Sequence, residues 1–434
     1  IQCNRCAFVC PHAAIRPYLL DQNEAQNAPE GFTTAALKGG KNLPEGTRYA
    51  IQVSQFDCTS CGSCADVCPA DALSMEPAKL TDASRTLWEY GLQLADKGSV
   101  FDPYSVKGSQ FKQPLLEFSA ACAGCGETPY AKLLTQLFGY RVYWANATGC
   151  SQAWGAPFPG IPYTVNKRGF GPAWTNSLFE NNAELSLGLY LGSTQQRAAE
   201  KARVEKLVKV LACGMENPKD GKGDAPEPAA MERVEAACES YLTAFDDFDA
   251  SRAASDTLVA AIEASMGSLA NSAKKVCEEV LKFKDQLAKK TFWMFGGDGW
   301  AYDIGFGGLD HVVASGANVN VLVVDTEVYS NTGGQSSKAT PAGAVAQFAA
   351  SGKKTGKKDL GAILMSYGNV YVAQVAMGAN YNQLVKALKE AEEYDGPSVI
   401  IAYAPCTSHG LKCGMHDVQG EMKRAVESGY WALY

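Results

Sequence analysis

Several short apolar runs that end at glycine or polar residues indicate the strands of an α/β sheet. Residues 291–295 run into glycines, residues 320–324 stop at Asp325, and residues 398–403 precede a proline and a cysteine. Unbroken apolar runs of this length are typical of parallel strands buried on both faces. Residues 304–315, between the first two runs, have the apolar spacing of a helix. We therefore expect a parallel sheet whose strands end in polar loops, where open α/β sheets bind ligands.

Helical periodicity dominates a block in the middle of the chain. Residues 195–213, 229–245 and 251–288 are rich in Ala, Leu, Glu and Lys, with apolar residues three and four positions apart. This spacing is typical of amphipathic helices. A helical insertion at about 195–288 is therefore expected inside an α/β domain of residues 117–434. Elsewhere in that domain the pattern predicts strands at 115–118 and 362–365, and helices near 342–350 and 381–394.

Polar stretches predict loops and a domain boundary. Residues 159–184 contain glycines and small polar residues and are expected to line the ligand site. Residues 353–358 form a lysine-rich turn that could dock an acidic redox protein, although exposed loop lysines usually have no specific role. Residues 87–116 are mixed in polarity and contain prolines and glycines, which predicts a linker after a first domain of residues 1–86.

Composition narrows the class of protein. The 434 residues carry a net charge of −7 and no long basic run, which argues against nucleic acid and anionic membrane as partners. There is no apolar run of about 18 residues and no secretory signal peptide, so a cytoplasmic location is expected. The 15 cysteines stand mostly in short, clustered spacings. In a reducing compartment such clusters indicate metal binding rather than disulfides.

Two cysteine runs near the start of the chain match the ligand pattern of bacterial ferredoxins. In this pattern three thiols hold one 4Fe–4S cluster and the fourth, followed by proline, crosses to a second cluster. The complete run has Cys58, Cys61, Cys64 and Cys68-Pro69. The other run has Cys3, Cys6 and Cys10-Pro11, and its first cysteine would precede Ile1. The crossed pattern predicts one cluster on Cys58, Cys61, Cys64 and Cys10, and another on Cys3, Cys6 and Cys68, one ligand short.

Zinc is the alternative for these thiols, because tetrahedral zinc also binds Cys-x-x-Cys pairs. A zinc site needs neither a third cysteine at the same spacing nor the proline that follows the last cysteine of both runs. The repetition favours iron–sulfur clusters in a small α+β domain of the two-cluster ferredoxin type.

A second set of cysteines lies in the α/β domain. Its members, each expected just after a strand, are Cys122, Cys125, Cys150 and Cys406. One sheet edge could gather them around a third 4Fe–4S cluster; the alternatives are a zinc site and free thiols in the core, since cysteine is often buried. The remaining cysteines are expected to be ordinary thiols: Cys213, Cys238, Cys277 and Cys413.

The loops that follow two of the expected strands carry the most specific chemistry. The first reads Gly296-Gly297-Asp298-Gly299-Trp300, and the second reads Asp325-Thr326-Glu327-Val328-Tyr329-Ser330-Asn331. Glycines allow a backbone to approach a phosphate closely, and one aspartate with oxygens from the next strand end suits a Mg²⁺ that keeps phosphate ligands. The pair of loops resembles the thiamine-diphosphate motif.

Together these parts resemble the family of pyruvate:ferredoxin (or flavodoxin) oxidoreductases, also called pyruvate synthases. The resemblance extends from residue 1 to residue 434 and is strongest in the two loops just described. Further matching motifs are Cys-Pro-His-Ala-Ala-Ile-Arg-Pro at 10–17, Ala-Gly-Cys-Gly-Glu-Thr-Pro-Tyr from Ala123, Gly-Pro-Ala-Trp from Gly171 and Asn-Ser-Leu-Phe-Glu from Asn176. The family usually continues beyond the position of Tyr434, so the chain is expected to be part of a longer protein.

The resemblance implies specific roles for residues of both loops. Asp298, the Thr326 side chain and the Val328 carbonyl would bind Mg²⁺. The diphosphate would be held by Gly297, Gly299, Trp300, Thr326, Glu327, Val328, Tyr329, Ser330 and Asn331. Glu127 and Cys150 would contact the cofactor, and Glu127 and Asn331 are the candidate catalytic residues. The resemblance also implies that Cys122, Cys125, Cys150 and Cys406 hold the cluster nearest to thiamine.

The implied reaction converts pyruvate, CoA and oxidised ferredoxin or flavodoxin into acetyl-CoA, CO₂ and the reduced carrier, with electrons passing through three 4Fe–4S clusters. In the family, upstream domains supply the carboxylate that activates thiamine and most contacts to pyruvate and CoA. The chain alone is therefore expected to be inactive, and a homodimer is expected for the intact enzyme. The alternatives are an oxidoreductase for another 2-oxoacid and a pure electron carrier, although a carrier would not need the Gly-Asp-Gly loop.

Overall fold

The computed structural model describes residues 2–39, 43–78, 80–97, 100–178, 181–216 and 227–434. They form two compact units, one of Ile1–Leu187 with Thr291–Tyr434 and one of Gly188–Lys290. Within the described ranges, no helix is both long enough and apolar enough to cross a membrane.

The first unit is built on a six-stranded sheet in which all neighbouring strands are parallel. In spatial order the strands are β10 (Tyr371–Val375), β11 (Ser398–Tyr403), β7 (Asn320–Asp325), β6 (Thr291–Gly297), β4 (Val142–Ala147) and β5 (Ala173–Ser177). The central strands β11 and β7 are buried at every position, as a parallel strand between two helical layers should be. The expected α/β class is confirmed.

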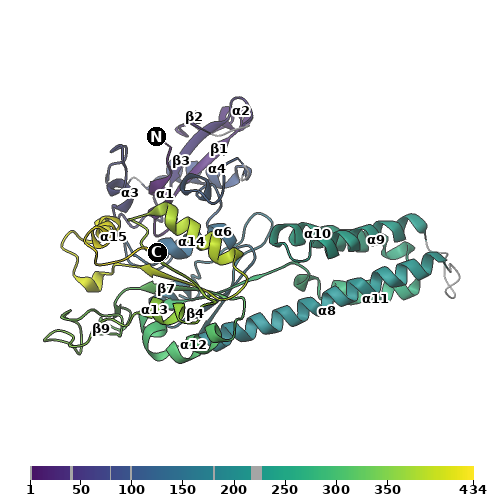
Figure 1. The fold of residues 1–434 in the computed structure, drawn as a ribbon. Helices are drawn as coiled ribbons and strands as arrows, with labels where there is room; N and C mark the ends of the chain where they lie inside the picture. The colour runs from purple at the N-terminus through teal and green to yellow at the C-terminus, as the bar shows by residue number, and fades with distance from the viewer. Residues whose placement is uncertain (1, 40–42, 79, 98–99, 179–180, 217–226) are drawn as a thin grey trace. The chain divides into compact units, whose positions relative to one another are not determined.

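Helices cover both faces of this sheet. Figure 1 shows α6 (Thr128–Phe138) and α14 (Tyr381–Glu393) on one face, and α12 (Phe306–Ala314) and α13 (Leu360–Met365) on the other. Every residue of α6 is buried, because this helix packs on other elements on all sides. Further elements of the unit are α5 (Val106–Ser109), α7 (Cys150–Gly155), β8 (Val328–Tyr329), β9 (Gln335–Ser336) and α15 (Val418–Glu427).

Three of the expected elements are wrong. Residues 115–118 form no strand, since only Leu116 makes an isolated bridge, to Tyr163. Residues 362–365, expected as a strand, lie in helix α13, which starts where the Asp359 side chain accepts the Ala362 N–H at 2.9 Å. Residues 342–350, expected as a helix, form a loop, and its backbone folds back so that the Gly343 N–H donates to the Lys353 carbonyl at 2.8 Å.

The two edge strands of the sheet, β5 and β10, were not expected. β5 has the sequence Ala-Trp-Thr-Asn-Ser and no residue that is fully buried, so it lacks the apolar run on which strand prediction depends. β10 is only partly buried. Both acquire strand structure by pairing with one inner neighbour, β4 and β11 respectively.

The ferredoxin-like part of the first unit is a small α+β fold. Strands β1 (Ile15–Leu20) and β3 (Arg48–Val53) pair antiparallel along their whole lengths, and the short β2 (Ala35–Ala36) joins at the edge. Its helices are α1 (Arg5–Val9), α2 (Gln22–Gln26), α3 (Ser63–Asp66) and α4 (Asp82–Gln93). Helix α4 runs across residue 86 and Gly91 lies against the Tyr18 ring, so the start of the expected linker packs on this sheet.

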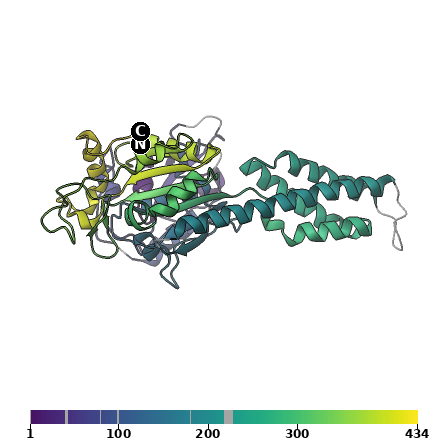
Figure 2. The same cartoon turned by 60° about the horizontal axis from the view of Figure 1, so that its bottom comes forward.

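The second unit is helical. Its helices are α9 (Pro228–Thr243), α10 (Phe248–Ser265), α11 (Asn271–Lys282) and most of the long α8 (Asn182–Glu216). They lie side by side in Figure 2 and share a core that includes Leu207, Val234, Leu258 and Val280. Cys238 and Cys277 are buried in this core, so they are packing residues, whereas Cys213 is exposed. Residues 217–226, expected as a polar connection, lie outside the described residues.

Candidate functional site

The carboxyl ends of β6 and β7 bring the two thiamine-like loops together. Gly297 pairs with Val324 in the sheet, so Asp298 and Thr326 leave adjacent strand ends. The Thr326 N–H donates to Asp298 Oδ1 at 3.2 Å, and Thr326 Oγ1 lies 3.0 Å from the same oxygen. Thr326 Oγ1 also lies 2.9 Å from the Val328 carbonyl oxygen. The three groups named as Mg²⁺ ligands thus place their oxygens in one small cluster.

Asp298 lies in a buried, acidic environment. Its side chain is buried, and Ser337 Oγ donates to its Oδ2 at 2.6 Å. Burial, together with the nearby Asp325 carboxylate, raises the pKa of Asp298 to about 8. A buried carboxylate next to a second one favours a bound positive charge. Carboxylate, hydroxyl and carbonyl oxygens are also the ligands that Mg²⁺ takes in proteins, so these residues fit the ion.

The glycines of the first loop have different surroundings. A Cβ on Gly299 would lie 2.5 and 2.6 Å from two ring carbons of Tyr329, so this glycine is required by packing. At Gly297 the nearest atom to such a Cβ would be the Val324 carbonyl oxygen at 3.8 Å, which leaves room for a ligand. Trp300 is fully buried in the wide helical turn Gly299–Ile304, and its ring packs against Gly296.

A cavity of about 170 Å³ joins the second loop to the second set of cysteines. Residues named from the sequence make up much of its lining: Cys122, Cys125, Glu127, Cys150, Thr326, Ser330, Asn331 and Cys406. The rest is mainly apolar and includes Ala121, Ala153, Trp154, Pro405 and Met415. Segments far apart in the sequence therefore converge on one pocket.

Among the described residues that line this pocket, Glu127 is the one carboxylic acid. Only 5% of the residue is exposed, and Trp154 Nε1 donates to Glu127 Oε2 at 2.9 Å. Burial raises the pKa of Glu127 to about 7, although the Trp154 hydrogen bond acts in the opposite direction. A carboxyl group with a pKa near neutrality can hold or release a proton at physiological pH.

The four thiols reach the pocket by different routes. Cys150 begins α7 after β4, and Cys406 follows β11, as expected. Cys122 and Cys125 follow no strand, which corrects the prediction for this pair. Their turn is instead pressed against the chain around Cys406, because a Cβ on Gly126 would lie 2.5 Å from the Pro405 carbonyl oxygen.

The thiol of Cys150 connects the cysteines with the second loop. Its Sγ lies 3.3 Å from Ser330 Oγ. Burial, then Glu127 and Cys406, raise the pKa of Cys150 to about 12. Burial and Glu127 likewise raise the pKa of Cys125, to which Cys150 also contributes. Cysteine binds a metal centre as a thiolate, so metal binding at these thiols would release their protons.

The thiols of the ferredoxin-like part lie close enough together to shift one another's pKa values, and their division between two clusters stays a prediction. Burial, then Cys10, Cys61, Cys6 and Cys58, raise the pKa of Cys64 to about 12. Burial raises the pKa of Cys6 to about 11, and Cys3 and Cys68 also raise it. In the described part of the chain, no three histidine, cysteine or carboxylate side chains converge as ligands of a single metal ion do.

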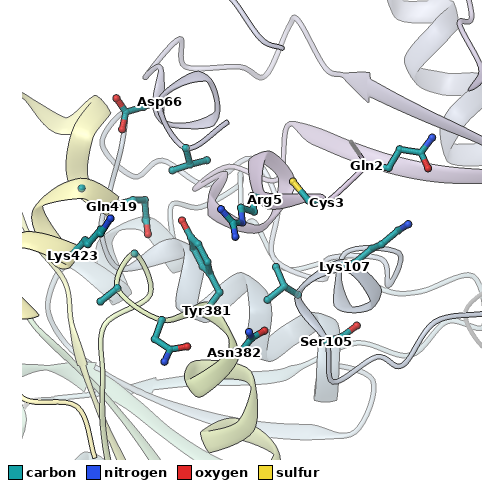
Figure 3. A pocket seen from close by; sticks show the side chains of 16 residues that line it. Gln2, Cys3, Arg5, Asp66, Ser105, Lys107, Tyr381, Asn382, Gln419 and Lys423 are labelled. Atoms are coloured by element: carbon teal, nitrogen blue, oxygen red, sulfur yellow. The ribbon is translucent and has the colours of Figure 1, made fainter. Parts of the chain in front are cut away.

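A larger cavity of about 840 Å³ lies beside Cys3 (Figure 3). Its lining carries the cationic side chains of Arg5, Lys107 and Lys423, and the Arg5 guanidinium lies 5.5 Å from the centre of the Tyr381 ring. Figure 3 shows Lys423 and Lys107 on opposite sides of this cavity. The positive lining suits the negative charge of a cluster held by thiolates at Cys3.

Comparison with known proteins agrees with both halves of the site. Residues 260–402 match the C-terminal TPP-binding domain of thiamine pyrophosphate enzymes, and residues 1–72 match the 4Fe-4S dicluster domain. The whole chain is 55% identical to pyruvate:ferredoxin oxidoreductase of Moorella thermoacetica and 53% identical to pyruvate-flavodoxin oxidoreductase of Enterobacter agglomerans. The chain belongs to the pyruvate:ferredoxin/flavodoxin oxidoreductase family. It spans 35% of the length of each of these two relatives.

The chain is also similar to proteins with other names. The chain is 48% identical, over all its residues, to 23% of a pyruvate dehydrogenase (NADP(+)) of Cryptosporidium parvum. Among solved structures, a 2-oxoglutarate:ferredoxin oxidoreductase of Magnetococcus marinus overlaps 67% of this chain and 65% of that chain, at 14% identity and a TM-score of 0.34. That score is too low to support an inference about this member of the family.

Sequence reasoning missed several residues that hold the loops of this family member in place. Ser337, Tyr302, Lys357 and Tyr430 contact the acidic side chains of the two loops. Glu327 belongs to the loop expected to hold the diphosphate, and its side chain accepts hydrogen bonds from Lys357 and Tyr430. No local sequence signal marks these contacts, since Ser337, Lys357 and Tyr430 lie at other places in the chain and reach the loops only through the fold.

Proposed function

We propose that this chain forms the thiamine- and iron–sulfur-binding part of an enzyme that oxidatively decarboxylates pyruvate with CoA. The products would be acetyl-CoA, CO₂ and two reducing equivalents carried by ferredoxin or flavodoxin. The observation that supports this most is the single pocket that contains Thr326 and Asn331 together with Cys122, Cys125, Cys150 and Cys406. The site of 2-oxoacid chemistry would then lie next to the cluster that accepts its electrons.

The loops at β6 and β7 would hold the cofactor. Asp298, Thr326 and Val328 would bind Mg²⁺, and the space beside Gly297 would admit the diphosphate. The backbone and side chains of residues 329–331 would complete the cradle. When bound, thiamine diphosphate supplies the stabilisation of a carbanion that decarboxylation of a 2-oxoacid requires.

Glu127 and Asn331 would act at the reacting end of the pocket. Glu127 would hold a proton near neutral pH, with Trp154 fixing the orientation of its carboxyl group. Asn331 would donate a hydrogen bond from its amide to the substrate. The apolar lining from Ala121, Ala153 and Met415 would exclude water, which strengthens such polar interactions.

The cysteines would carry electrons away from this pocket in three groups. The first, around Cys150, contacts the thiamine loop through Ser330. The second and third are the two groups of the ferredoxin-like domain, around Cys64 and Cys6. Their burial and hydrogen bonds would tune the reduction potentials of three 4Fe–4S clusters.

The remaining requirements of the reaction would be met outside this chain. The relatives are about three times as long, and we assign the activating carboxylate and most contacts to pyruvate and CoA to their additional length. Assembly as a homodimer, with ferredoxin or flavodoxin as acceptor, completes the proposal.

The proposal is tested by iron content and cofactor binding of the chain reconstituted under anaerobic conditions. Cys406→Ser should remove the cluster nearest to the thiamine loop and lower the iron content by about four atoms per chain. Cys413→Ser, which alters an exposed thiol of the same loop, is the matched control and should leave iron unchanged. Binding of thiamine diphosphate with Mg²⁺ should quench the fluorescence of Trp154 and Trp300.

Two outcomes would contradict the proposal. Equal iron content in the Cys406→Ser and Cys413→Ser variants would contradict a third cluster bound by Cys406. A fluorescence that does not respond to thiamine diphosphate and Mg²⁺ would favour a pure electron carrier.

A further inference from the structure

Lys357 lies in the lysine-rich turn at 353–358, but its side chain is turned inward. Its Nζ lies 2.8 Å from Asp325 Oδ2 and 3.0 Å from Glu327 Oε1, and only 26% of the side chain is exposed. These two carboxylates flank Thr326 in the sequence. One ammonium group therefore bridges the residues on either side of an expected Mg²⁺ ligand.

Two tyrosines extend this bridge. Tyr302 Oη donates to Asp325 Oδ2 at 2.8 Å, and Tyr430 Oη lies 2.8 and 2.9 Å from the two carboxylate oxygens of Glu327. The Glu327 N–H donates to Asp325 Oδ1 at 3.0 Å, so the two acidic residues are also linked through the backbone. The resulting network, made of Asp325, Glu327, Lys357, Tyr302 and Tyr430, is called the acidic-turn network below.

The network surrounds an unusual backbone conformation. Glu327 has a φ of 61°, in the left-handed region that residues with a Cβ seldom adopt. Such a conformation persists only where the surrounding structure holds it. The Thr340 hydroxyl donates to the Glu327 carbonyl and adds a further restraint. This turn determines where Thr326 Oγ1 and the Val328 carbonyl point.

Lys357 also neutralises buried negative charge next to the expected Mg²⁺ ligands. Asp325 and Glu327 are both buried, and the Asp298 carboxylate is close to Asp325. Buried like charges repel strongly unless a partner of opposite charge is present. Lys357 supplies that partner for Asp325 and Glu327, which leaves Asp298 as the carboxylate available to a cation.

We propose that Lys357 is a positioning residue of the thiamine-diphosphate–Mg²⁺ site, which it orders through Asp325 and Glu327 without contacting the cofactor. This inference rests on the proposed function. It also replaces the docking role considered for the lysine-rich turn. Lys353 and Lys358 are likewise directed inward, to the carbonyls of Thr340 at 2.5 Å and Tyr302 at 3.0 Å.

The test compares lysine variants of the full chain. The concentration of Mg²⁺ that half-saturates thiamine-diphosphate binding is measured by tryptophan fluorescence, with thermal unfolding recorded in parallel. Lys357→Met should raise this concentration by about tenfold. Loss of a residue that supports a metal ligand typically weakens metal binding by about 10–100-fold, and the expected change is at the lower end of that range. Lys357→Arg should restore most of the affinity. Lys354→Met, at an exposed position of the same turn, is the matched control and should behave as wild type.

A double variant separates positioning from general stability. Lys357→Met combined with Glu327→Gln removes the ammonium group and one of its two carboxylates, and should recover part of the Mg²⁺ affinity lost in the single variant. A purely structural role would lower the unfolding temperature of Lys357→Met without changing its Mg²⁺ dependence, and that result would overturn the inference.

Tyr430→Phe provides a milder test if Lys357→Met does not fold. Tyr430 is half exposed, so the substitution removes only its hydrogen bonds to Glu327 and should raise the required Mg²⁺ concentration in the same direction. An unchanged requirement would count against the acidic-turn network. If the wild-type chain itself shows no Mg²⁺-dependent binding of thiamine diphosphate, the proposed function fails instead.

Discussion

Single residues of the first loop separate the demands of folding from those of binding. Gly299 and Gly297 lie two positions apart, yet only Gly299 is pressed against another side chain, the ring of Tyr329. A sequence motif presents both as equivalent phosphate-approaching glycines. The surroundings make one of them a packing residue and leave the other facing open space.

Alanine substitution should therefore lower stability at Gly299 and cofactor binding at Gly297. Gly299→Ala should lower the free energy of unfolding by about 1–3 kcal/mol, because its Cβ overlaps the Tyr329 ring. Gly297→Ala should leave the unfolding free energy nearly unchanged but weaken thiamine-diphosphate binding, since it fills the space of the ligand. Urea unfolding and fluorescence titration of both variants check this. Equal loss of stability in the two variants would contradict it.

At the scale of elements, a buried carboxylate organises the opposite end of the sheet. Glu392 of α14 accepts hydrogen bonds from Thr291 Oγ1 at 2.8 Å and Trp293 Nε1 at 3.1 Å, both on β6. It also accepts from Asn320 Nδ2 on β7 at 3.3 Å and pairs with Arg141, just before β4, at 2.9 Å. One side chain thus holds the amino ends of three strands, whereas the loops of the site leave their carboxyl ends.

Loss of this charge should affect stability and not the site. Glu392→Gln removes one charge of the buried Arg141–Glu392 pair and weakens the acceptor of the β6 and β7 hydrogen bonds, and should lower the unfolding free energy by about 3–5 kcal/mol. The Mg²⁺ dependence of thiamine-diphosphate binding should stay within about twofold of wild type, because positions on well-separated parts of a fold behave almost independently. Urea unfolding and the fluorescence titration give the two values. A large change in Mg²⁺ dependence would mean that the two ends of the sheet are coupled.

At the scale of the whole first unit, Lys132 joins the ferredoxin-like part to the α/β part. It belongs to α6, is 1% exposed, and donates hydrogen bonds from Nζ to the carbonyls of Ala7 and Phe8 at the end of α1. Cations are favourable at the carboxyl end of a helix. Burial nevertheless lowers the pKa of Lys132 to about 8.

Its contribution to stability should therefore depend on pH. The folded pKa of Lys132, about 8, lies below its ordinary value of 10.5, so the folded state favours the neutral amine. The unfolding free energy of wild type relative to Lys132→Met should rise as the pH increases from about 8 to about 10.5, the window in which the unfolded state binds more protons than the folded state. Below about pH 8 the difference should stay at its lowest value. Urea unfolding of both proteins across this range measures the difference. A difference that is independent of pH would contradict the assignment.

The sequence alone determined the inner strands, the loops of the site and the family, because the patterns that predict these features are local. Apolar runs predicted β6, β7 and β11, and the glycine and aspartate residues after them marked the loops of the site. The ferredoxin spacing of the first cysteines predicted the 4Fe-4S domain, which the match of residues 1–72 confirms. The family and its cofactor-binding domains followed from the same motifs.

Only the tertiary structure decided the rest, because those features depend on contacts between distant parts of the chain. The edge strands β5 and β10 form by pairing with neighbours, and their own sequences carry weak signals. The pocket needs Cys122, Cys150 and Cys406 to converge from three separate segments. Lys357 appeared as one exposed lysine among several until the fold placed it between Asp325 and Glu327. Such long-range contacts leave no periodic trace in a single sequence.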